Sequence, residues 1–118
     1  ANDKFKLEAN KIPSFPHNVI IVKGIIQNTL ENFLKKNNPK INFIHIDTDT
    51  YETCKFILNK TKPYLVNNAI ILFDELYNFP GWDVGEYKAL NECFKSEEYQ
   101  YKAFSADRTA VAIQIFKN

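Results

Sequence analysis

Glycine is scarce in this chain, and methionine is absent. The 118 residues include only three glycines, Gly24, Gly81 and Gly85, and their spacing matches no glycine-rich loop that cradles phosphate groups. A nucleotide-binding loop of that type is therefore excluded from this sequence. The chain starts at Ala1 and contains no methionine, which is consistent with a fragment of a longer protein.

No hydrophobic run approaches the length of a membrane span. The nearest, 19–26, is short and contains Lys23, whereas a transmembrane helix needs about 20 apolar residues. No signal-peptide pattern is present. The net charge is only +1, whereas a nucleic-acid-binding surface needs a basic face. We therefore expect a cytoplasmic protein that binds neither membranes nor nucleic acids.

Cysteine is rare as well. Cys54 and Cys93 fall in predicted helices at a spacing that matches no metal-binding motif. We interpret both as small buried hydrophobic residues in a reducing compartment. A disulfide or a redox role is the alternative.

Segments rich in β-branched and apolar residues alternate with segments of helical spacing. The predicted strands are 18–23, 41–47, 69–74, 99–106 and 109–116. The last two form a predicted antiparallel hairpin, and the order β-α-β-α-β-α-β-β predicts an α/β fold with a Rossmann-like, mostly parallel sheet. We predict that residues 1–17 form an irregular segment and that residues 18–118 form one partial α/β domain.

Each predicted helix opens on a polar residue that is followed three positions later by glutamate. This is the capping-box pattern, in which the two side chains satisfy free backbone N–H groups. The three pairs are Asn28 with Glu31, Asp49 with Glu52, and Asp83 with Glu86. For Asp49 the pattern favours a capping role over a role as a metal ligand.

Two predicted strands end in acidic residues. Asp47 follows one apolar run, and Asp74 and Glu75 follow the next. Ligands of open parallel sheets bind outside the carboxyl ends of the strands, so we expect these carboxylates to share one edge. Carboxylates that lie so close together repel one another unless a metal ion or a proton neutralises their charge. A metal site is one interpretation, and carboxylates that bond the next loop or helix are the other.

Two further features allow more than one interpretation. His45 lies inside a predicted strand, where we expect a buried, hydrogen-bonded core histidine within the sheet. Tyr77, Phe79 and Trp82 share a loop with turn chemistry. These aromatic residues either pack locally or shape a pocket for an acceptor molecule.

The order of three motifs resembles the class I S-adenosylmethionine-dependent methyltransferases, in particular the macrocin-like O-methyltransferases. The motifs are Val19–Gly24 followed by Gln27–Leu30, then His45–Thr53, then Phe73–Glu75 followed by Asn78–Trp82 and Glu86–Ala89. With the terminal hairpin, the resemblance covers roughly residues 18–116. It implies a C-terminal half that lacks the first two strands of the methyltransferase fold.

The resemblance also implies a cofactor site and a metal site. In this family one segment borders the adenine of S-adenosylmethionine, and its position is matched here by Gly24, Ile25, Ile26 and Gln27. The alternative is that these four residues are only the end of a strand followed by apolar packing. The ligands of a divalent ion, usually Mg²⁺, are matched by Asp47, Asp74 and Glu75. Oxygen ligands suit that ion. Asp47 also matches the acid usually proposed as the general base.

The implied function is metal-assisted methyl transfer to a hydroxyl of a small molecule. One alternative is a non-catalytic remnant that acts as a binding or oligomerisation module, because the missing strands leave a sheet edge on which a second copy can pair. Another is a metal-dependent phosphatase or glycosyltransferase, in which an apolar strand also precedes an acidic pair such as Asp47 and Asp49. Tyr51 departs from the phosphatase pattern.

Overall fold

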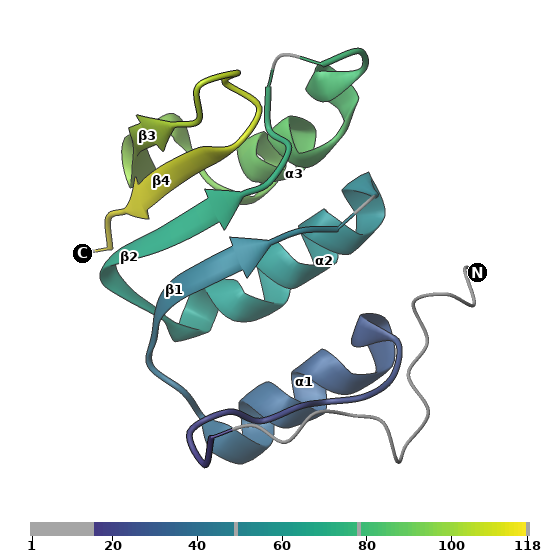
Figure 1. The fold of residues 1–118 in the computed structure, drawn as a ribbon. Helices are drawn as coiled ribbons and strands as arrows, with labels where there is room; N and C mark the ends of the chain where they lie inside the picture. The colour runs from purple at the N-terminus through teal and green to yellow at the C-terminus, as the bar shows by residue number, and fades with distance from the viewer. Residues whose placement is uncertain (1–15, 49, 78, 118) are drawn as a thin grey trace.

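A computed structural model describes residues 16–48, 50–77 and 79–117. These residues form one four-stranded sheet and three α-helices (Figure 1). The strands are β1 (Ile41–Ile46), β2 (Leu65–Phe73), β3 (Tyr99–Phe104) and β4 (Val111–Ile115). The helices are α1 (Ile26–Asn37), α2 (Tyr51–Thr61) and α3 (Glu86–Cys93), with short 3-10 helices η3 (Lys62–Tyr64), η4 (Trp82–Val84) and η5 (Ser96–Glu98).

The strand order β1-β2-β4-β3 confirms the α/β fold with a C-terminal antiparallel hairpin. Within the described residues the sheet is mixed, with one parallel and two antiparallel strand pairs, whereas the sequence predicted a mostly parallel sheet. β1 and β2 run parallel, and α2 connects them. β4 inserts between β2 and β3 and is antiparallel to both. The parallel register places Ile46 opposite Phe73, so both strands reach their carboxyl ends at the same level.

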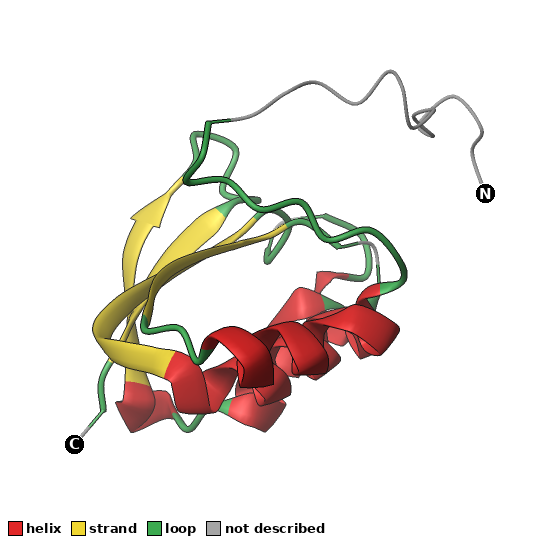
Figure 2. Ribbon diagram, turned by 90° about the horizontal axis from the view of Figure 1, so that it is seen from below, coloured by secondary structure: helices red, strands yellow, loops and turns green. Residues whose placement is uncertain are grey.

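The helices cover one face of the sheet, as Figure 2 shows. The core lies between that face and the helices, where Phe73 and Ile113 from the sheet meet Leu58 and Leu90 from α2 and α3, all fully buried. Because side chains alternate along a strand, the residues between these positions lie on the other face. On that face Phe43 is 54% exposed.

The strand predicted at 18–23 is wrong. Residues 16–25 form neither helix nor strand, and the side chains from Val19 to Val22 are 42–67% exposed. A strand needs partners for its backbone N–H and C=O groups, and within the described residues β1 is paired only with β2. The segment lies instead along α1, where Ile20 and Val22 line grooves with Thr29 and Phe33 (Figure 1).

Two of the three predicted helix caps are also wrong. α1 follows Ile25 and α3 follows Gly85, and neither residue makes a side-chain cap. α2 is capped by Thr50, whose Oγ1 accepts a hydrogen bond from the Thr53 N–H at 3.2 Å. Asp49, the predicted cap of this helix, lies outside the described residues.

The two cysteines are buried and free, as predicted. Burial is the main cause that raises the pKa of both thiols, Cys54 and Cys93. Neither is therefore a reactive thiolate near neutral pH. No helix in the described part of the chain is long and apolar enough to cross a membrane.

Candidate functional site

The carboxyl ends of β1 and β2 bring the predicted acidic residues to one edge of the sheet. Asp47 directly follows β1, and Asp74 and Glu75 directly follow β2. The Asp74 N–H donates to the Ile46 C=O at 3.0 Å, which extends the parallel pairing to the acids themselves. All three carboxylates raise the pKa of one neighbour, Glu86, electrostatically. The sequence therefore predicted this acidic edge correctly.

The tip of β2 is held from two further sides. The Glu75 N–H donates to Oε1 of Glu86, the first residue of α3, at 2.9 Å. The next N–H, that of Leu76, donates at 2.7 Å to the C=O of Thr109, which precedes β4. The Leu76 side chain is fully buried. The acidic tip is thus fixed by α3 and by the hairpin.

His45 belongs to β1 but is exposed and not a core residue, so the prediction of a buried histidine is wrong. Alternation along β1 directs Ile44 and Ile46 toward the helices and leaves His45 on the face without helices. Its Nε2 lies 3.6 Å from Oδ1 of Asp74, and both side chains are nearly half exposed. This distance is too long for a hydrogen bond, and an exposed pair of this kind contributes at most about 1 kcal/mol.

The acidic edge is not arranged as a metal site in this structure. Within residues 16–48, 50–77 and 79–117, no group of three or more His, Cys, Asp or Glu side chains could hold a metal ion. Mg²⁺ demands near-ideal octahedral geometry from converging oxygens. Asp47, Asp74 and Glu75 share the edge but do not fit such an ion as they stand, and their role as ligands stays a prediction.

Glu86 is the site residue that the sequence reasoning missed. Glu86 is only 5% exposed. Its Oε1 accepts the hydrogen bond from the Glu75 N–H, whereas Oε2 is buried and has no hydrogen-bond partner in the described part of the chain. Burial is the largest cause that raises the pKa of Glu86 to about 7, the charges of Glu75, Asp74 and Asp47 add to it, and the Glu75 N–H bond opposes it. The sequence marked this residue as part of a capping pattern and as the first residue of the Glu86–Ala89 motif, and neither signal predicted a role for it in the site.

A cavity of about 240 Å³ lies beside Glu86, between the start of α2 and the turn before α3. Thr48 and two aromatic residues, Tyr51 and Phe79, are among the residues that line it. The Thr48 Oγ1 is buried and has no hydrogen-bond partner among the described residues. Two residues that line the cavity, Thr48 and Glu86, thus each have one buried oxygen without a hydrogen-bond partner among the described residues.

The predicted cofactor segment begins α1. Gly24 has φ of 122°, and a Cβ added there would lie 3.0 Å from Cγ2 of Thr29, so glycine is required for both reasons. Ile25 is 66% exposed, while Ile26 packs against the core. The segment thus offers a free apolar surface at Ile25 next to a fixed turn.

Gln27 joins this segment to the start of α2. Its Nε2 donates to Oγ1 of Thr53 at 3.1 Å, and the Thr50 hydroxyl donates to the same oxygen at 2.8 Å. Figure 1 shows that α1 and α2 both begin on the side toward which β1 and β2 point. The structure therefore places the predicted cofactor residues and the acidic residues at the same end of the sheet.

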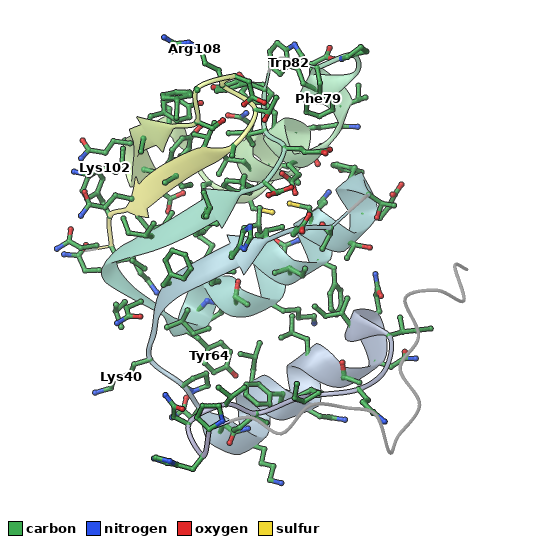
Figure 3. The ribbon with its side chains drawn as sticks, viewed as in Figure 1. Lys40, Tyr64, Phe79, Trp82, Lys102 and Arg108 are labelled. Carbon is green, nitrogen blue, oxygen red and sulfur yellow. The ribbon has the colours of Figure 1, made fainter. Side chains whose placement is uncertain are left out.

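The three aromatic residues of the predicted loop divide between two environments. Tyr77 and Trp82 pack with ring centroids 5.2 Å apart in a cluster that continues to Tyr87 and Phe104. Phe79 lines the cavity instead. Figure 3 shows Phe79 and Trp82 in the segment that leads to α3. Tyr77 and Trp82 thus pack locally, and Phe79 faces the candidate site.

Comparison with known proteins assigns the family. The model of a family described as "Methyltransferase domain" matches residues 2–76, which is more than half of the chain. The chain therefore belongs to the methyltransferase-domain family, and its fold is of the class I S-adenosylmethionine-dependent type, as predicted. No curated protein matches the chain.

Solved structures agree with this assignment. CalS11, a TDP-rhamnose 3′-O-methyltransferase of calicheamicin biosynthesis, superimposes with a TM-score of 0.68 at 28% identity, over 79% of this chain and 40% of that chain. SMU.776, a candidate methyltransferase solved with S-adenosylhomocysteine, gives 0.55 at 10% identity, over 80% of this chain and 30% of that chain, and supports the fold alone. The chain thus spans less than half the length of these proteins.

Proposed function

We propose that the protein containing this chain transfers a methyl group from S-adenosylmethionine to a hydroxyl oxygen of a small molecule. The family assignment is the observation that carries this proposal. The 28% identity with a TDP-rhamnose 3′-O-methyltransferase supports a hydroxyl acceptor, with a sugar hydroxyl as the first class to test.

The residues at the start of α1 fit a role beside the cofactor. The exposed Ile25 offers an apolar surface on which an adenine ring can pack, and Gln27 fixes this turn against α2. When bound, S-adenosylmethionine supplies an electrophilic methyl group. The contribution of this chain is to hold the acceptor in line with that group, because correct positioning alone removes much of the barrier.

Asp47 is proposed as the general base. It is exposed at the end of β1, where its carboxylate can accept the proton of the hydroxyl as the oxygen takes up the methyl group. Asp47→Asn should lower kcat by about 10²–10⁴-fold with unchanged binding of S-adenosylhomocysteine. Asp83→Asn, at an exposed aspartate of η4, is the matched control. An Asp47→Asn enzyme with full kcat contradicts this role.

Metal assistance is a separate prediction. Mg²⁺ ligation by Asp47, Asp74 and Glu75 requires these side chains to move together, since they do not fit the ion as they stand. Removal of divalent ions with EDTA, followed by titration with MgCl₂, measures the dependence directly. Full activity in EDTA contradicts metal assistance and leaves the base role of Asp47 untouched.

The decisive experiment for the overall function uses the full-length protein. Calorimetric titration with S-adenosylhomocysteine should show saturable binding, and methyl-labelled S-adenosylmethionine should label TDP-rhamnose or another hydroxylated sugar. Absence of both binding and labelling contradicts the proposal.

A second candidate function is self-association through β1. Within the described residues the outer edge of β1 is unpaired, and Phe43 beside it is 54% exposed. An open strand edge invites pairing with a second copy. Sedimentation of the wild type and of Phe43→Lys tests this directly, because a homodimer through this edge should become monomeric in the variant.

A further inference from the structure

Thr53 joins two parts of the candidate site that lie far apart in the sequence. Its Oγ1 accepts a hydrogen bond at 3.1 Å from Nε2 of Gln27, the last residue of the predicted cofactor segment. The same oxygen accepts a second bond at 2.8 Å from the hydroxyl of Thr50, the N-cap residue of α2. A hydroxyl oxygen has two acceptor positions, so these two donors occupy both of them.

The bond from Gln27 fixes a residue that is otherwise exposed near the start of α1. Ile26 beside it packs against the core, whereas Ile25 stays 66% exposed. The bond to Thr53 is therefore a second attachment point for this segment, in addition to the packing of Ile26. It holds the segment against α2 and leaves the surface of Ile25 open.

The bond from Thr50 fixes the loop that follows Asp47. Thr50 lies three positions after Asp47 and donates to the Thr53 hydroxyl, while its own Oγ1 accepts from the Thr53 N–H at 3.2 Å. The start of the loop is held as well, since the Ile46 C=O accepts from the Asp74 N–H. The loop is thus attached to β2 at one end and, through Thr53, to α1 at the other.

We propose that Thr53 is a positioning residue of the methyl-transfer site. Its hydroxyl oxygen holds the cofactor segment and the loop of Asp47 in a fixed relation to each other, so that cofactor and base meet the acceptor oxygen in one geometry. Such positioning matters because a displacement of about 1 Å can cost about 10²-fold in rate. The inference rests on the proposed function, since it takes these two segments as the cofactor side and the base side of that site.

The cofactor side is tested by calorimetric titration of the full-length protein with S-adenosylhomocysteine. Gln27→Met and Thr53→Val each remove the bond between the two residues, so each should weaken binding by about two- to tenfold. The double variant should bind no more weakly than Thr53→Val, because both substitutions remove the same bond. Thr53→Ser retains the hydroxyl and should restore the affinity to within about twofold of the wild type.

Lys60→Met separates this role from the general packing of α1 on α2. Nζ of Lys60, in the last turn of α2, donates to Oε1 of Glu31 in α1 at 2.8 Å. This is a second polar contact between the two helices, at the opposite end of α2 from Thr53. Its loss should leave the affinity for S-adenosylhomocysteine unchanged, whereas a role of Thr53 in helix packing alone predicts equal weakening in Lys60→Met and Thr53→Val.

The loop side is measured in ¹H–¹⁵N spectra of the full-length protein without a ligand. Gln27→Met should shift the backbone amides of Thr48 and Thr50, because the lost bond changes the position of Thr53. In the Thr53→Val background the same substitution should leave these amides unshifted.

Three results overturn the inference: wild-type affinity in Gln27→Met, equal weakening in Lys60→Met and Thr53→Val, or loop amides that do not respond to Gln27→Met. Because Gln27 is exposed, Gln27→Met keeps the fold even where Thr53→Val does not. A wild-type protein that does not bind S-adenosylhomocysteine contradicts the proposed function and with it the role of Thr53 in methyl transfer. The spectra then still decide whether Thr53 links the two segments.

Discussion

Glu86→Gln should stabilise the protein at alkaline pH and have little effect in acid. The pKa of Glu86 is about 7 in the folded protein, compared with its ordinary value of 4.5. The folded state therefore keeps a proton between pH 4.5 and 7 that the unfolded chain releases. Because the folded state binds more protons in this range, the free energy of unfolding falls as pH rises through it, and the loss is complete above pH 7.

The magnitude follows from the two pKa values. Their difference corresponds to about 3 kcal/mol at about 1.4 kcal/mol per pH unit. Because the effective dielectric constant at buried sites in proteins is higher than that of a dry interior, we expect an effect of about 1–3 kcal/mol at pH 8. Glutamine is neutral at every pH, so the variant does not have to bury a negative charge at alkaline pH. It also retains an oxygen that accepts the hydrogen bond from the Glu75 N–H.

Denaturant unfolding of the full-length protein in EDTA, at pH 4, 6 and 8, measures the effect. The variant should match the wild type at pH 4 and exceed it by about 1–3 kcal/mol at pH 8. Glu97→Gln, at an exposed glutamate, should show no such pH-dependent difference. A constant difference between Glu86→Gln and wild type across the three pH values would refute the reasoning.

Three further predictions concern stability and use the same unfolding assay. Gly24→Ala should destabilise by about 1–3 kcal/mol, because φ of 122° and the 3.0 Å approach to Thr29 both oppose a Cβ; an unchanged midpoint contradicts this. Thr50→Ala should remove the cap of α2 and destabilise by about 0.5–2 kcal/mol, with Thr50→Ser as the control that restores it. Phe73→Ala should destabilise by about 3–5 kcal/mol, since the ring is fully buried between sheet and helices; a loss below 1 kcal/mol is the contradictory result.

Local patterns predicted the elements whose partners lie within the chain. The apolar runs of β1 and β2 pair with each other, and the alternating run before Asp107 pairs with β4, so all four strands form at or near the predicted positions. β2 begins at Leu65 and not at residue 69, because Leu65 also pairs with β1. The run at 19–23 has the same β-branched composition but no strand beside it among the described residues. Composition gives a segment its preference for extended backbone, whereas pairing decides whether it becomes a strand.

The errors at His45 and at the helix caps have a related cause. The prediction of a buried His45 assumes that helices cover both faces of the sheet, yet the described helices cover one face only (Figure 2). The capping pattern at Asp83 and Glu86 predicted a reciprocal pair at a helix start. The chain instead uses Glu86 to bond Glu75, a residue of another element, and sequence spacing carries no information about such a contact.

The acidic edge and the cavity share one residue, Glu86. Its Oε1 accepts from the Glu75 N–H at the tip of β2, and the same residue lines the cavity. The charges of Glu75, Asp74 and Asp47 also act on the pKa of its carboxyl group. A change in the position or the protonation of Glu86 is therefore expected to affect both places, so the acids and the cavity are parts of one site.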